Sequence, residues 1–132
     1  MKTLEKTCIV DDDPILVYGM KLMMKQVEFC EEILVFNNGQ EAIDGLLDML
    51  NRGEALPSVI FLDLNMPVMD GWDFLESFVK IPNNNTERVT IYVVSSSINP
   101  ADEQRAREYE VVGNYFVKPI TELDLTGILQ SA

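Results

Sequence analysis

Short apolar runs alternate along the chain with longer segments of helical periodicity. The apolar runs predict strands near 7–10, 33–36, 58–62, 89–94 and 114–117. The intervening segments predict helices near 14–27, 39–51, 70–80, 100–111 and 121–130. This regular alternation indicates an α/β fold, with a parallel five-stranded sheet, right-handed crossovers and helices on both faces.

Polar residues mark where the helices begin. Asp13 and Asn99 each precede a proline, which is typical of an N-cap followed by the first helical residue. Asn38 and Thr121 each open a segment that resembles a capping box, and Asp70 can cap the third helix. We therefore assign Asp13 to the first helix, which leaves the two preceding aspartates free.

Four of the predicted strands end in reactive groups. Asp11 and Asp12 follow the first strand, Asp63 follows the third, Ser95 the fourth and Lys118 the fifth. A serine after a strand is usually a turn former, and a lysine before proline is usually solvated. The carboxyl ends of parallel strands meet at one rim, however, and α/β proteins bind ligands there. The combination predicts a shared acidic pocket.

An acidic pocket of this kind requires a cation. Two carboxylates ~4 Å apart repel by about 4 kcal/mol at an effective dielectric constant near 20. Mg²⁺ suits Asp11, Asp12 and Asp63, because it accepts one or two carboxylates and keeps its other positions for water and phosphate. One Mg²⁺ and the ammonium of Lys118 would balance the three negative charges.

Composition limits the remaining possibilities. A chain of 132 residues suits a single domain spanning 1–132. The net charge of −12 argues against direct nucleic-acid binding, and the absence of histidine removes His-based catalysis and His metal ligands. No apolar run approaches the ~20 residues that cross a bilayer, and the N-terminus lacks a secretory pattern. We expect a cytoplasmic protein without membrane contact, with Cys8 and Cys30 as buried apolar residues.

Together these motifs resemble the receiver domains of bacterial two-component response regulators, the CheY-like family. The resemblance covers nearly the whole chain and rests on Val10-Asp11-Asp12, Leu62–Pro67, Met69-Asp70-Gly71, Ser95 and Lys118-Pro119. It implies a flavodoxin-like, three-layer fold with strand order 2-1-3-4-5. It also implies phosphorylation of an aspartate at the rim of the sheet.

The resemblance also assigns roles to individual residues. Asp63 becomes the phosphoacceptor, and Asp11, Asp12, Asp63 and the backbone carbonyl of Asn65 become ligands of Mg²⁺. Ser95 and Lys118 bind the phosphoryl group, although Ser96 and Ser97 offer alternative hydroxyls, and Tyr115 is the aromatic residue that turns inward in the active state. Asn65 and Ser97 tune the lifetime of the phosphoryl group. The family also suggests a cis peptide bond between Lys118 and Pro119.

The implied function is that of a signalling switch in a phosphorelay. The implied partners are a sensor histidine kinase or histidine phosphotransfer protein and a downstream protein target, with room for a homodimer. The chain would catalyse only its own phosphorylation and dephosphorylation, so it is not an enzyme acting on an external substrate. The output surface would comprise the fourth helix, the fifth strand and the fifth helix.

Three alternatives remain beside this interpretation. A haloacid-dehalogenase-type phosphatase would need a second aspartate at position 65, which is Asn. A flavodoxin-like FMN carrier would need a phosphate loop rich in Ser, Thr and Gly after the first strand, where this chain has three aspartates. A degenerate receiver would keep the fold and act as a phosphorylation-independent scaffold.

Two features outside the predicted site have plain structural interpretations. Trp72, near the start of the third helix, is expected to be partly buried packing. Asp102 and Glu103 are expected to be ordinary helix-start charge in the fourth helix.

Overall fold

The computed structural model describes residues 3–82 and 86–131. Its single sheet is parallel throughout, and the strand order β2-β1-β3-β4-β5 matches the order that the family resemblance implies. The strands are β1 (Leu4–Val10), β2 (Cys30–Phe36), β3 (Val59–Leu62), β4 (Thr90–Ser95) and β5 (Val112–Val117). The helices are α1 (Pro14–Gln26), α2 (Gly39–Asn51), α3 (Gly71–Phe78), α5 (Pro100–Arg107) and α6 (Glu122–Ser131).

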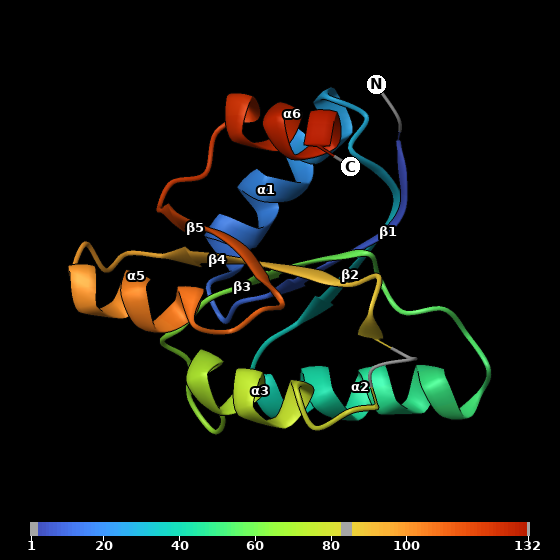
Figure 1. Cartoon of the computed structure of the whole chain (residues 1–132). Coiled ribbons are helices and arrows are strands. Elements are labelled where there is room, and N and C mark those ends of the chain that lie inside the picture. The colour runs from blue at the N-terminus through green and yellow to red at the C-terminus, as the bar shows by residue number, and fades with distance from the viewer. Residues whose placement is uncertain (1–2, 83–85, 132) are drawn as a thin grey trace.

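The helices form two layers around the sheet. Helices α1 and α6 cover one face, α2 and α3 cover the other, and α5 lies beside the β4–β5 edge (Figure 1). Within β3, Ile60 and Leu62 belong to the apolar cluster under α2 and α3, whereas Val59 and Phe61 belong to the cluster under α1 and α6. Because successive strand residues point to opposite faces, a fully apolar strand serves two cores at once.

The helix starts are capped as the sequence predicts. Asp13 accepts hydrogen bonds from the N–H groups of Ile15 and Leu16, and Asp70 accepts one from Asp73. Thr121 and Asp124 cap each other reciprocally, with the backbone N–H of each donating to the other's side chain. These contacts satisfy backbone donors that the first helical turn leaves free.

Helix α5 is shorter than the predicted segment 100–111. It ends at Arg107, because the following N–H groups of Glu108 and Tyr109 bond three residues back, to Arg105 and Ala106, and tighten the chain into a turn. Strand β5 then begins at Val112, two residues earlier than predicted. Cys8 is buried, whereas Cys30 is only partly buried, so the expectation for Cys30 was too strong.

Candidate functional site

Backbone hydrogen bonds bring the carboxyl ends of four neighbouring strands together at one rim. The N–H of Asp63 donates to the carbonyl of Val10 at 3.0 Å, just past the ends of β1 and β3. The N–H of Lys118 donates to the carbonyl of Ser95 at 2.8 Å, just past the end of β5. The sheet ladder therefore fixes the positions from which these side chains project.

Three carboxylates and one ammonium group converge at this rim. Oxygen atoms of Asp11, Asp12 and Asp63 all lie within 4.8 Å of one another. The Lys118 Nζ lies 3.2 Å from Asp11 Oδ2 and 3.5 Å from Asp63 Oδ1. Asp11 and Asp63 are buried at 3% and 5% exposure, whereas Asp12 is exposed, so solvent reaches the cluster from the side of Asp12.

The burial of like charges shifts the protonation equilibria of the cluster. Burial raises the pKa of Asp11 and of Asp63, and repulsion from Asp11 raises the pKa of Asp63 further, whereas Lys118 opposes the rise at both. Burial lowers the pKa of Lys118, but attraction to the two carboxylates outweighs it and the net pKa is raised. The cluster thus holds more negative charge than its single cation balances.

The donor set fits a hard divalent cation. All three side chains offer carboxylate oxygens, which are the ligands that Mg²⁺ and Mn²⁺ prefer. The excess negative charge and the exposed side at Asp12 would favour a cation that keeps some of its water. The acidic triad is therefore consistent with a divalent metal site.

The connection from β3 to α3 is pressed closely against Asp63. The N–H of Gly71 donates to the carbonyl of Leu64 at 3.0 Å, and a Cβ atom at position 71 would lie 2.7 Å from the Leu64 Cα and collide with the Asp63 carbonyl. Only glycine fits at this position without moving the backbone. In the same connection, Val68 adopts a φ of 68°, an unfavourable left-handed conformation for a β-branched residue.

Asn65 and the cis peptide bond border the cluster. Asn65 is exposed, and its backbone N–H donates to Asp63 Oδ1 at 3.4 Å. The Lys118–Pro119 bond is cis, which confirms that expectation. The roles of Asn65 as a metal ligand and as a lifetime-tuning residue stay predictions.

Ser97, rather than Ser95 alone, organises the β4–α5 connection. Ser95 is fully buried, and its Oγ accepts the N–H of Ser97 at 3.1 Å. The carbonyl of Ser97 accepts the hydroxyl of Tyr115 at 3.0 Å, and Tyr115 lies inward at 8% exposure. The Oγ of Ser97 donates to Asp102 Oδ2 at 2.7 Å.

Asp102 lies in the first turn of α5, as expected, but it also binds Ser97, so the expectation of ordinary helix-start charge was incomplete. The only signal in the sequence for this contact was weak: the five-residue separation of Ser97 and Asp102 on either side of the helix start. Trp72 is partly buried, as expected, and it also lies under the guanidinium of Arg105, 4.0 Å from the ring centroid.

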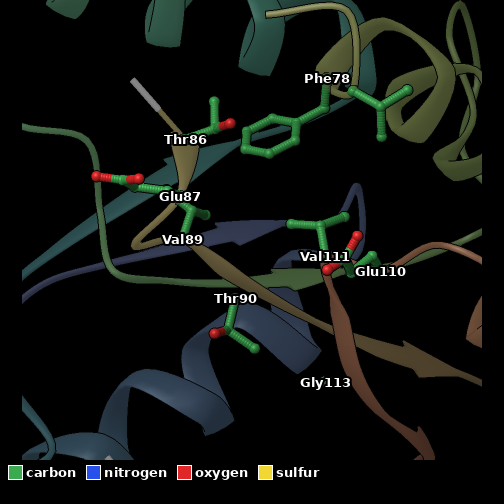
Figure 2. Close-up of a pocket in the computed structure, with 9 residues that line it drawn as sticks. Phe78, Thr86, Glu87, Val89, Thr90, Glu110, Val111 and Gly113 are labelled. Atoms are coloured by element: carbon green, nitrogen blue, oxygen red, sulfur yellow. The ribbon is translucent and has the colours of Figure 1, made fainter. Parts of the chain in front are cut away.

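A second hollow lies at the other end of the strands, away from the carboxylate cluster. Figure 2 shows its lining at the amino-terminal ends of β4 and β5, formed by Phe78, Val79, Thr86, Glu87, Val89, Thr90, Glu110, Val111 and Gly113. Its two glutamates, Glu87 and Glu110, are exposed, and neither forms an ion pair within the described parts of the chain. We therefore place the functional site at the acidic rim.

Comparison with known families agrees with this placement. Residues 7–130 match the family described as the response regulator receiver domain. The chain belongs to this family. The CheY-like, flavodoxin-like fold and the link to two-component signalling that the sequence predicts are thereby confirmed.

Individual relatives are similar over much of the receiver domain. Protein PilG of Pseudomonas aeruginosa is 26% identical over 129 residues, which cover 96% of this chain and 85% of PilG. A two-component response regulator from Cytophaga hutchinsonii has a similar structure, with a TM-score of 0.90 and 26% identity over 98% of this chain and 97% of the other. The bacteriophytochrome response regulator AtBRR gives a TM-score of 0.77 at 26% identity, over 98% of this chain and 92% of its own.

Other relatives are much longer than this chain. The sensor histidine kinase CheAY of Helicobacter pylori is 32% identical over 92 residues, which cover 68% of this chain but 11% of that protein. A protein-glutamate methylesterase/protein-glutamine glutaminase of Methanococcoides burtonii matches 57% of this chain, over 20% of its own length, at 32% identity. Receiver domains pair with histidine kinases.

None of the helices in the described parts of this chain has the length and hydropathy of a membrane span.

Proposed function

We propose that the chain is a phosphoacceptor switch in which Asp63 receives a phosphoryl group from a phosphohistidine. The donor would be a sensor histidine kinase or a histidine phosphotransfer protein, and residues 1–132 would form one receiver domain. The observation that carries this proposal is the position of the Lys118 ammonium, which lies within 3.5 Å of both Asp63 and Asp11. One cation is thus placed beside the nucleophile and the neighbouring acid.

Each residue has a defined task in the transfer. A carboxylate oxygen of Asp63 attacks the phosphorus, the new O–P bond forms as the N–P bond of phosphohistidine breaks, and the electron pair stays on the imidazole. Lys118 and the Ser95 hydroxyl then donate to phosphoryl oxygens. Mg²⁺ held by Asp11, Asp12, Asp63 and the Asn65 carbonyl would neutralise the charge on those oxygens. The chain would act only on itself, through its own phosphorylation and dephosphorylation.

The phosphoryl group would act by drawing in the Ser95 hydroxyl, which moves the connection after β4 beside Tyr115. Moving a two-state equilibrium from 1:99 to 99:1 requires about 5.5 kcal/mol. Hydrogen bonds to charged groups contribute roughly 1.5–3 kcal/mol each, so those from Ser95 and Lys118 would together supply much of this difference. The inward position of Tyr115 would then define the output surface of α5, β5 and α6, which a downstream protein or a second copy of the chain would recognise.

The exposed face of α1 suits the phosphate donor. Ile15, Tyr18 and Leu22 are 83%, 65% and 51% exposed, and their spacing of three and four residues places them on one stripe. The helix also carries the exposed residues Lys21 and Lys25 and no acidic residue, in a chain of net charge −12. Because α1 starts directly after Asp11–Asp13, a helix docked on this stripe would present its phosphohistidine to Asp63.

A labelling experiment tests the proposed function. The protein is incubated with acetyl phosphate and Mg²⁺, and intact mass is used to look for one phosphoryl adduct that hydroxylamine removes. We expect the adduct in the wild type and in the control variant Asp73→Asn, whose carboxylate lies on α3, and no adduct in Asp63→Asn. A wild-type protein that stays unlabelled would support the scaffold interpretation instead.

A further inference from the structure

Helix α5 is attached to the rest of the domain with little apolar contact. Of its eight residues, only Ala106 is buried, packed among Leu64, Val93 and Tyr115. A helix on a protein surface normally buries a full apolar stripe. Because α5 lacks this stripe, its position depends on polar contacts at its two ends.

At its N-terminal end, α5 is bound to the rim of the sheet through Ser97. The N–H of Ser97 donates to the Ser95 Oγ, its carbonyl accepts the Tyr115 hydroxyl, and its own Oγ donates to Asp102. The Oγ of Ser97 also accepts the N–H of Asn99 at 3.2 Å. One residue thus joins the buried hydroxyl at the rim, the inward tyrosine and the first turn of α5.

On its other side, α5 and the turn after it contact α3. The guanidinium of Arg105 lies over the ring of Trp72, and the hydroxyl of Tyr109 donates to the carboxylate of Glu76. Both α3 residues belong to a helix that is anchored by buried Phe74. The contacts with α3 therefore tie a weakly buried helix to a firmly buried one.

We propose that Asp102 is a positioning residue that couples the Asp63 site to α5. Asp102 acts through Ser97, because it accepts the hydrogen bond of the Ser97 hydroxyl. This bond fixes the backbone of Ser97, whose carbonyl accepts the Tyr115 hydroxyl and whose N–H donates to the Ser95 Oγ. When the Ser95 hydroxyl turns towards a phosphoryl oxygen, the N–H of Ser97 loses its acceptor. The resulting shift of Ser97 pulls on Asp102 and changes the contact between Arg105 and Trp72.

The coupling to a phosphoryl group rests on the proposed function, whereas the anchoring of Ser97 does not. In the free protein, loss of the Asp102 carboxylate should release both Tyr115 and the start of α5. With Asp63 phosphorylated, loss of the same carboxylate should disconnect Trp72 from the rim. The two consequences are measured separately.

The first arm compares Asp102→Ala with Glu103→Ala in the free protein. Both variants remove one carboxylate from the first turn of α5, so they lose the same favourable interaction with the helix dipole. Glu103 pairs with Arg107 along the exposed side of the helix, whereas only Asp102 contacts Ser97. We expect amide exchange over residues 100–107 to be about tenfold faster in Asp102→Ala than in Glu103→Ala.

Two further measurements separate positioning from general stability. Asp102→Asn keeps an oxygen that can accept the Ser97 hydroxyl, so its exchange should be intermediate and closer to wild type. Urea unfolding should give the two alanine variants the same midpoint, because Asp102 is only partly buried and Glu103 is exposed. Equal exchange rates in Asp102→Ala and Glu103→Ala would overturn the proposal.

The second arm uses Trp72, which is the only tryptophan of the chain. Each protein is labelled with acetyl phosphate and Mg²⁺, the adduct is quantified by intact mass, and tryptophan emission is compared at equal labelling. Wild type and Glu103→Ala should show the same change of emission, and Asp102→Ala should lose at least half of it. An equal response in Asp102→Ala would contradict the coupling.

The outcomes distinguish this inference from the proposed function. If wild type is labelled but its Trp72 emission stays constant, the coupling is wrong and the phosphoacceptor function stands. If wild type is not labelled, the proposed function fails and the coupling to a phosphoryl group fails with it. The exchange comparison in the free protein then decides on its own whether Asp102 anchors Ser97.

Discussion

Helices α3 and α5 have the same length of eight residues, yet they are attached to the protein in different ways. Helix α3 buries Phe74, Leu75 and Phe78 against the sheet, whereas α5 buries only Ala106. Burying a large apolar side chain contributes roughly 1.5–3 kcal/mol, more than a single surface contact. A few polar contacts can therefore reposition α5 while α3 keeps its place.

The same difference separates the two sides of the functional rim. Gly71, at the start of α3, is packed against the backbone of Asp63, so the phosphoacceptor candidate belongs to the fixed part. Ser97, which follows the rim residue Ser95 by two positions, is held in place by hydrogen bonds to Ser95 and Asp102 and not by packed apolar side chains. A rigid acceptor beside an adjustable connection is the arrangement that a switch requires, because binding geometry stays constant while the output surface changes.

The largest expected effect is on the α3 side. Phe74→Ala removes a fully buried ring that stacks on Phe78, and it should lower the free energy of unfolding by about 3–5 kcal/mol. Gln104→Ala on the exposed side of α5 should change it by less than about 0.5 kcal/mol. Urea unfolding measures both. Comparable losses in the two variants would break the contrast between the helices.

Mg²⁺ binding should stabilise the β3–α3 connection beside Asp63 and leave α5 unaffected. At a hundred times its dissociation constant, a ligand adds about 2.7 kcal/mol to the free energy of unfolding. We expect this gain with Mg²⁺ for wild type and for the control Asp44→Asn, and a much smaller one for Asp12→Asn, which removes an exposed carboxylate of the cluster. Amide exchange should slow in the β3–α3 connection and stay unchanged in α5. Equal slowing in both regions would argue against separate attachment.

The charge of the cluster should make stability depend on pH. Burial and repulsion from Asp11 raise the pKa of Asp63, so the folded state binds a proton more tightly than the unfolded chain. This contribution to stability is complete below the unfolded value of about 3.9 and is lost as the pH rises through the raised folded value. Without Mg²⁺, Asp63→Asn should therefore be more stable than wild type at pH 7, by roughly 1–2 kcal/mol.

The pH series has an internal control. The advantage of Asp63→Asn should shrink as the pH falls, because the folded wild type then takes up a proton at Asp63 more readily than the unfolded chain does. The variant Asp73→Asn, which removes an exposed carboxylate of α3, is the control. Unfolding free energies at several pH values measure the difference. If the stability difference between Asp63→Asn and wild type is the same at pH 4 as at pH 7, the difference comes from side-chain packing and not from the charge of Asp63.

The sequence predicts the fixed part of the molecule better than the adjustable part. Strand Val59–Leu62 is apolar throughout and is followed directly by the carboxylate of Asp63, so both the sheet and the rim can be predicted from local patterns. The contacts of Asp102 with Ser97 and of Arg105 with Trp72 join residues whose meeting depends on how α5 settles beside the sheet. Local pattern carries no information on that placement, because α5 has no apolar stripe to define its buried face.

The smallest expected effect on overall stability is that of replacing Arg105, and this change tests most directly whether α3 and α5 are attached differently. A cation above an aromatic ring at an exposed site contributes about 0.5–1 kcal/mol, so Arg105→Gln should lower overall stability by no more than that. It should nevertheless change the emission of Trp72 and speed amide exchange in α5, because this contact is one of the few that hold the helix. The matched control Arg107→Gln removes a guanidinium that contacts Glu103 and Asn114 and lies away from Trp72, and it should leave the emission unchanged. If Arg105→Gln affects α3 exchange as strongly as α5 exchange, the two helices share one cooperative unit, and the division into a fixed acceptor and an adjustable helix does not hold.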